Sequence, residues 1–124
     1  MNFKDKEAIY LQIADYVSEH ITLNKWLPDE KVPSVRDLAV ELQVNPNTVM
    51  RTYEYLQQHE IIFNKRGLGL FVTANAIENI KTIRRERFMQ QELPDFFRSL
   101  YLLDISLEEL QKRYEDFKLK NYKN

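Results

Sequence analysis

The fold of this chain is decided by residues Val32 to Phe71, which read VPSVRDLAVELQVNPNTVMRTYEYLQQHEIIFNKRGLGLF. This stretch contains two amphipathic helical patterns on either side of a tight connection, and a short hairpin pattern follows them. A helix-turn-helix with a β-wing is the simplest structure with this order of elements, and it is mostly used to read duplex DNA. The stretch therefore predicts a fold that is mostly α-helical with a small β-wing.

Each helical pattern in this stretch begins with a residue that can cap a helix. Ser34 precedes the first pattern, and Asp37 three residues later completes a capping-box arrangement. Asn45 precedes the second pattern, and Pro46 follows at the first helical position, where its missing N–H costs nothing. We therefore expect one helix to start at Ser34 and the next at Asn45.

A hairpin pattern follows the two helical patterns. The apolar segments Ile61 to Phe63 and Leu70 to Val72 flank a loop, residues 64–69, which holds both glycines of the chain. Gly67 and Gly69 allow positive φ and a close approach of the backbone to another molecule. We expect a β-hairpin with a basic, glycine-containing tip.

Helical patterns also lie on both sides of the deciding stretch. Residues 7–22 carry one apolar stripe at helical spacing, and residues 75–103 carry a second series. Pro94 lies inside that series and is expected to kink or divide the helix. Ser106, with Glu109 three residues later, predicts the start of a last helix.

Composition excludes several classes of protein. The 124 residues fit one or two small domains, and the absence of cysteine excludes disulfides and thiolate metal sites. No apolar run approaches the ~18 residues of a membrane span, and the first ten residues lack a signal-peptide pattern, so we expect a soluble, cytoplasmic protein. His20 and His59 are the only histidines, and no nucleophile–base pair or metal-ligand spacing stands out. We expect no catalytic residue, metal or cofactor, and therefore not an enzyme.

The net charge of −1 does not favour nucleic acid as a partner. Residues 1–73 carry 8 Lys and Arg against 10 Asp and Glu, which gives −2, and residues 74–124 carry 10 against 9, which gives +1. Binding to DNA must therefore depend on where particular charges lie. A winged-helix module that binds another protein remains the alternative, and the two differ in salt dependence, which is steep for DNA.

Particular residues around the helix-turn-helix suit contact with DNA. Arg51 can bond guanine O6 and N7, Asn47 can bond adenine N6 and N7, and Thr48 can contact a phosphate or a thymine methyl group. Ser34 and Arg36 open a helix whose N-terminus attracts anions. The other candidates are the cap Asn45 and the wing residues Lys65, Arg66, Gly67 and Gly69.

These candidates also have simpler interpretations. Ser34 and Asn45 are caps whatever the function, and Arg51 can pair with Glu54 on a solvated helix face. Lys65 and Arg66 can be ordinary charges of a hairpin tip. The indication lies in the combination of residues.

Four linked motifs carry a resemblance to a known family. They are AIYLQI at 8–13, VPSVRDLA at 32–39, VNPNTV at 44–49 and RGLGLFV at 66–72. In order and spacing they resemble the N-terminal domain of the GntR family of bacterial transcription regulators, over about residues 7–73. The resemblance implies a regulator that binds a pseudo-palindromic operator in double-stranded DNA as a homodimer. It also implies that Arg36, residues 45–48 and Gly67 approach the DNA.

The size of the C-terminal part resembles that of the small YtrA-like subfamily. In that subfamily two helices serve dimerisation, and the regulated genes often encode ABC transporters. The resemblance further implies a repressor and an unidentified small-molecule effector. The chain departs from the family where Asn24, Asp29 and Glu60 replace turn glycines and where Met50 replaces an arginine of some members. No operator sequence can therefore be carried over, and Arg51 can take over the role of that arginine.

We expect two domains, a winged helix-turn-helix at 1–74 and a helical dimerisation region at 75–124. The second is too short to enclose its own large apolar side chains, and burying them against a second copy is the simplest solution. Folding back onto the winged domain is the alternative. The residues expected at the dimer interface are Phe88, Phe96, Phe97, Leu100, Tyr101 and Leu103.

Overall fold

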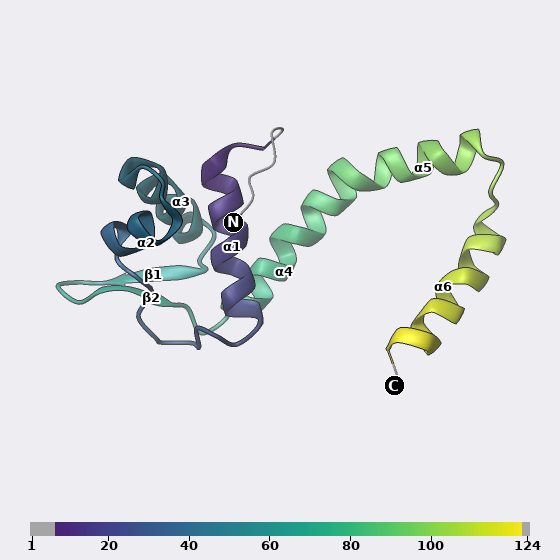
Figure 1. Cartoon of the computed structure of the whole chain (residues 1–124). Coiled ribbons are helices and arrows are strands. Elements are labelled where there is room, and N and C mark those ends of the chain that lie inside the picture. Colours follow the sequence, from purple (N-terminus) through teal and green to yellow (C-terminus); the bar gives the residue numbers. More distant parts are fainter. Residues whose placement is uncertain (1–6, 123–124) are drawn as a thin grey trace. The chain divides into compact units, whose positions relative to one another are not determined.

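The computed structural model describes residues 7–122 and divides the chain into two compact units, one ending at Ile83 and the other beginning at Arg84. The predicted mostly helical fold with a small antiparallel sheet is confirmed (Figure 1). The elements of the first unit are α1 (Ile9–Thr22), α2 (Val35–Leu42), α3 (Pro46–Gln58), β1 (Ile62–Lys65), β2 (Gly69–Val72) and the beginning of α4 (Ala76–Arg87). The second unit contains the end of α4, the π-helix η1 (Phe88–Glu92), α5 (Leu93–Leu102) and α6 (Leu107–Asn121).

Hydrogen bonds from side-chain caps start three helices at the predicted positions. Ser34 Oγ accepts a hydrogen bond of 3.0 Å from the backbone N–H of Asp37 at the start of α2. Asn45 Oδ1 accepts one of 2.8 Å from the N–H of the second residue of α3, and Ser106 Oγ accepts one of 3.1 Å at the start of α6. These bonds satisfy N–H groups that have no partner inside their own helix.

Left-handed backbone occurs at the three positions where the resemblance implies turn glycines. Asn24, Asp29 and Glu60 have φ of 60°, 66° and 56°. Asn and Asp tolerate this conformation better than other residues with a Cβ, whereas a glutamate is strained there. The carbonyl of Glu60 accepts a hydrogen bond of 2.8 Å from Asn79 Nδ2, which helps to hold this turn. All three turns thus adopt left-handed backbone at residues other than glycine.

The core of the first unit is built from the apolar faces of α1, α2 and α3 and from the hairpin. Tyr53 is its largest fully buried side chain, and its hydroxyl donates a hydrogen bond of 2.7 Å to the carbonyl of Pro33. Ala76 and Ile80 of α4 also belong to this core, with 1% and 3% of their surface exposed. The compact unit thus extends to Ile83, while the functional division between 1–74 and 75–124 stays a prediction. Residues 1–6 and 123–124 of those two domains lie outside the described residues.

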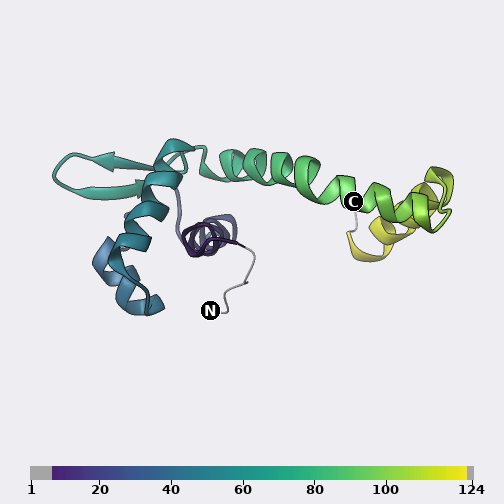
Figure 2. The ribbon, with the colours of Figure 1, turned by 90° about the horizontal axis from the view of Figure 1, so that it is seen from above.

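The β-hairpin is longer and its turn shorter than predicted. Residues 64, 65 and 69, expected in the loop, belong to the strands, because β1 pairs with β2 as far as Lys65 opposite Gly69. Residues 29–32 lie along the other edge of β2, where the N–H of Val32 donates to the carbonyl of Leu70 at 2.9 Å. The hairpin extends away from the helices of its unit, so that the turn at 66–68 projects from them (Figure 2).

The helix of residues 75–103 is divided near Pro94, as predicted. The α-helical geometry changes to a π-helix over Phe88–Glu92, and α5 begins with Pro94 in its first turn. Proline has no N–H to donate to the preceding turn, and a π-bulge accommodates that loss. At the other end of α5, Asp104 adopts φ 54° and the N–H of Ile105 donates to the carbonyl of Leu100 at 3.0 Å. The chain then turns back into α6 (Figure 1).

Most of the apolar residues expected at a dimer interface are exposed in the single chain. The exposed fractions are 45% for Phe88, 42% for Phe96, 51% for Phe97, 83% for Tyr101 and 67% for Leu103. The expectation that Leu100 is exposed is wrong, because only 8% of its surface is accessible. Helical periodicity places Leu100 on the apolar face but does not reveal that its side chain is buried in the single chain. No helix within residues 7–122 combines the length and the apolar character that crossing a bilayer demands.

Candidate nucleic-acid interface

The first two turns of α3 present a polar surface opposite a buried one. Asn47 and Arg51 are exposed and Thr48 is half-buried, whereas Val49 and Thr52 on the other side are completely buried. Asn45 caps the helix, so its side chain already accepts a hydrogen bond within the chain. The structure thus brings together three of the predicted contact residues on one exposed arc.

Arg51 does not extend freely from this arc. Its guanidinium carbon lies 4.0 Å from the centre of the Tyr10 ring, which is the distance of a cation–π stack. A hollow of about 350 Å³ adjoins this stack and joins the start of α1 to the start of α3. Its lining residues are Ala8, Ile9, Tyr10, Asn47, Thr48 and Arg51.

Sequence reasoning missed Tyr10 as a member of this surface. Tyr10 falls on the apolar stripe expected over residues 7–22, but its side chain is only half-buried. Its position in the first turn of an amphipathic helix could have indicated partial exposure, because the end of such a helix extends beyond the core. Which basic side chain would lie over its ring could not be read from the sequence, because Tyr10 and Arg51 are 41 positions apart.

The start of α2 presents a second group of candidate contacts. Ser34 and Arg36 are both exposed, and Ser34 Oγ is the capping acceptor for the N–H of Asp37. The N–H groups at a helix start carry partial positive charge, so an anion is favoured near this end of α2. Asp37 in the first turn competes for the same charge.

The wing separates its two basic residues. Lys65 was expected at the tip, and that placement is wrong, because it is the last residue of β1. Its Nζ lies 2.9 Å from Asp29 Oδ1 and 4.2 Å from the centre of the Phe71 ring. Arg66 lies in the turn and is exposed. The charge of Lys65 is therefore paired with groups of the protein, whereas the charge of Arg66 is exposed to solvent at the turn.

The two glycines of the wing have different reasons to be glycine. Gly67 has φ 79°, and a Cβ built there would meet nothing within 4 Å. Gly69 has φ 110°, and a Cβ built there would lie 2.9 Å from Cε of Lys31. Gly67 therefore keeps a bare, protruding backbone, while Gly69 lets the side chain of Lys31 cross the hairpin.

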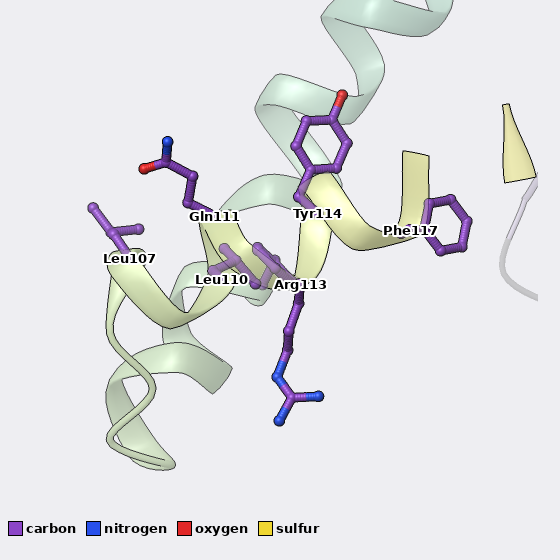
Figure 3. Close-up of a pocket in the computed structure, with 7 residues that line it drawn as sticks. Leu107, Leu110, Gln111, Arg113, Tyr114 and Phe117 are labelled. Carbon is purple, nitrogen blue, oxygen red and sulfur yellow. The ribbon is translucent and has the colours of Figure 1, made fainter. Parts of the chain in front are cut away.

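The second unit carries an open apolar groove on α6, with a volume of about 520 Å³ (Figure 3). Its lining residues are Phe96, Leu107, Leu110, Gln111, Arg113, Tyr114 and Phe117. Phe96 belongs to the predicted dimer interface, but sequence reasoning assigned no surface role to the residues of α6. The helical spacing of Leu107, Leu110, Tyr114 and Phe117 was the signal that could have found this face.

Comparisons with known proteins match this chain to members of one family. A family model described as "Bacterial regulatory proteins, gntR family" matches residues 9–72. The uncharacterized HTH-type transcriptional regulator YhcF of Bacillus subtilis is 32% identical over 93% of this chain and 93% of its own. The HTH-type transcriptional repressor YtrA of the same organism is 36% identical over 70% of each chain.

Solved structures show the same similarity in three dimensions. A putative transcriptional regulator of the GntR family from Bacteroides thetaiotaomicron matches with a TM-score of 0.81 and 48% identity, over 91% of this chain and 98% of that one. The DNA-binding domain of AraR, solved in complex with the operator ORR3, matches with a TM-score of 0.53 and 25% identity, over 59% of this chain and 88% of that one.

Proposed function

Because this chain belongs to the GntR family and is a DNA-binding helix-turn-helix transcription regulator, not an enzyme, we propose that it represses transcription as a homodimer on a pseudo-palindromic operator. The observation that carries the proposal is the exposed polar arc of α3, formed by Asn47, Thr48 and Arg51. The other face of this helix is core, so the arc is rigidly presented, as a helix that enters the major groove must be.

The arc offers donors for bases, and its surroundings offer contacts for phosphates. Arg51 reads guanine through O6 and N7, Asn47 reads adenine through N6 and N7, and Thr48 contacts a phosphate or a thymine methyl group. Phosphate contacts position a protein on the duplex, and we assign them to the start of α2 and to the turn of the wing. The residues are Ser34 and Arg36 in α2, and Arg66 and Gly67 in the wing. Asn45 and Gly69 support these segments, and Lys65 supports the wing through Asp29.

What the second unit leaves exposed supports the proposed dimerisation. Five aromatic and aliphatic side chains of the predicted interface lie on the surface of a single chain, which is unusual for a stable monomer. Two joined winged units bind two half-sites with a large gain in affinity through effective concentration. We assign the contact between copies to Phe88, Phe96, Phe97, Tyr101 and Leu103, with Leu100 packed beneath them.

Repression is the direction that relatedness favours. The relative YtrA is named a repressor. A dimer bound over a promoter excludes other proteins from the same DNA, and a small-molecule effector that alters the dimer would relieve the block. The protein would act in the cytoplasm with the chromosome.

The decisive experiment selects sequences bound by the full chain from random duplex DNA. We expect enrichment of an inverted repeat whose half-sites lie about one helical turn, roughly 10 base pairs, apart. Sedimentation of the complex should give two protomers per duplex. The logarithm of affinity should fall linearly with the logarithm of the salt concentration.

Three results would contradict parts of the proposal separately. Failure to enrich any sequence, together with a flat salt dependence, would favour a module that binds another protein. A single half-site with one protomer would remove the homodimer. Increased expression of a reporter placed behind the selected operator, on addition of the regulator, would replace repression by activation.

A further inference from the structure

We propose that Tyr10 is a positioning residue for sequence recognition, because its ring holds the guanidinium of Arg51 in the orientation that reads a base. This inference rests on the proposed operator binding. It assigns a specificity role to α1, an element outside the helix-turn-helix pair.

The stack between the two side chains limits where Arg51 can point. The guanidinium carbon lies 4.0 Å above the centre of the Tyr10 ring. A long arginine side chain on an exposed helix face otherwise samples many rotamers, and binding must order it. The stack orders the Arg51 side chain before DNA binds. The entropic cost of ordering this side chain is therefore part of folding and does not weaken DNA binding.

Stacking leaves the recognition chemistry of Arg51 available. The ring contacts the group at its central carbon, whereas the N–H donors of a guanidinium lie at its edge and point outward. Two such donors are what a bidentate contact with guanine O6 and N7 requires. Asn47 and Thr48 line the same hollow as the stack, so the ordered guanidinium lies among the other proposed contacts.

Tyr10 is itself held firmly against α3. Its carbonyl accepts a hydrogen bond of 2.8 Å from Oγ1 of Thr52, a residue that is completely buried. Its ring packs edge-on against the ring of Tyr55, with 6.2 Å between the ring centroids. The Tyr55 ring in turn packs against the ring of His59, with 4.5 Å between their centroids. The ring therefore has a fixed position relative to the helix that carries Arg51, as a positioning residue must.

The test measures a specificity ratio, which is the affinity for the selected operator divided by that for a scrambled duplex at the same salt concentration. Tyr10→Leu removes the aromatic face and should lower the ratio about threefold per half-site, or about tenfold for a dimer. Tyr10→Phe keeps the face and should keep the ratio. In an Arg51→Ala background, Tyr10→Leu should change the ratio no further, because the residue through which it acts is missing.

Tyr16→Leu is the matched control on the same helix. Tyr16 is also half-buried, but its hydroxyl donates a hydrogen bond to Glu41 and its ring contacts that of His20. Unlike Tyr10, it does not line the hollow with Asn47, Thr48 and Arg51. This variant should leave the specificity ratio unchanged. Melting curves of all variants establish that they fold.

The outcomes distinguish this inference from the proposed function. If the wild-type chain enriches no sequence, the operator proposal itself fails. If the wild type discriminates but Tyr10→Leu has the same ratio, or weakens both duplexes equally, the positioning role is overturned while operator binding stands. A further loss on adding Tyr10→Leu to Arg51→Ala would also overturn it. If Tyr10→Leu does not fold, the ring-current shift of the Arg51 Nε–H signal in the wild type decides, and an unshifted signal overturns the stack.

Discussion

Replacing Lys65 and Arg66 by methionine, one at a time, should separate the internal support of the wing from its contact with DNA. The residues are neighbours in sequence and carry the same charge, but Lys65 is paired with Asp29 whereas Arg66 is exposed in the turn. Methionine keeps an unbranched stem of similar length and removes the charge together with its N–H donors. Lys65→Met should therefore affect stability, and Arg66→Met should affect DNA binding.

The expected magnitudes follow from the exposure of the partners. The side chains of Lys65 and Asp29 are 33% and 72% exposed, so solvent screens the ion pair and it contributes about 0.5 kcal/mol. The stack of Lys65 on Phe71 adds about 0.5 kcal/mol at such an exposed site. A total of about 1 kcal/mol lowers the Tm of a unit of this size by roughly 4–8 °C. Arg66→Met should leave the Tm unchanged.

The effect on DNA binding should be the reverse. Each phosphate contact contributes about 0.9 to the slope of log affinity against log salt, so losing Arg66 from both halves of a dimer should lower the slope by about 2. Lys65→Met should leave that slope unchanged. Fluorescence anisotropy of a labelled operator between about 50 and 200 mM salt measures the slopes, and thermal denaturation followed by circular dichroism measures the Tm.

Asp29→Asn is the matched control, because it frees Lys65 without removing its charge. Its stability should fall about half as far as that of Lys65→Met, because the contact of Lys65 with the Phe71 ring remains, and its salt slope should not decrease. A Lys65→Met variant with an unchanged Tm and a salt slope as low as that of Arg66→Met would refute the reasoning. Lys65 would then contact DNA directly and would not stabilise the wing.

Three further predictions concern stability and assembly. Glu60→Gly should raise the free energy of unfolding in urea by about 0.5–1 kcal/mol, because φ of 56° strains a residue with a Cβ; an unchanged midpoint would contradict this. Tyr53→Phe should cost about 1–2 kcal/mol below pH 10, because it leaves the carbonyl of Pro33 without its donor. Burial raises the pKa of the Tyr53 hydroxyl, with a smaller contribution from Glu41. Near pH 10 only the unfolded state therefore releases this proton, so the stability advantage of the wild type over Tyr53→Phe should shrink above that pH. A stability advantage that grows with pH would be the contrary result. A chain ending after Ile83 should sediment as a folded monomer with little operator affinity. A chain ending after Ala74 should also unfold more easily, because it lacks the core residues of α4. Equal stability of the two truncated chains would count against the core described for the first unit.

Local features of the fold were predictable from the sequence because their causes are local. Ser34, Asn45 and Ser106 each start a helix through a hydrogen bond that spans two or three residues. Pro94 divides its helix because it lacks an N–H group. The π-helical form of the interruption was not predictable, since it depends on how the whole turn accommodates that loss.

Features that depend on distant partners were not predictable. The pair between Lys65 and Asp29 spans 36 positions, and no periodicity links the two. Arg51 has Glu54 on the next turn of its own helix, but the ring of Tyr10 in another helix lies over its guanidinium. Leu100 follows the same helical spacing as exposed residues and is nevertheless covered. Sequence patterns identify faces of helices, whereas tertiary packing decides which members of a face stay free.

The edge pairing between residues 29–32 and β2 has a consequence for the order of folding. This pairing and the contact between Tyr10 and Thr52 both join segments about 40 positions apart, so the first unit must close large loops before its core forms. The second unit joins α5 and α6 through a short turn at residues 103–106 and should form faster. During synthesis the slower unit is made first, because it precedes α5 and α6 in the chain. The winged unit therefore gains time to complete its long-range contacts before the apolar surfaces of α5 and α6 emerge to find a second chain.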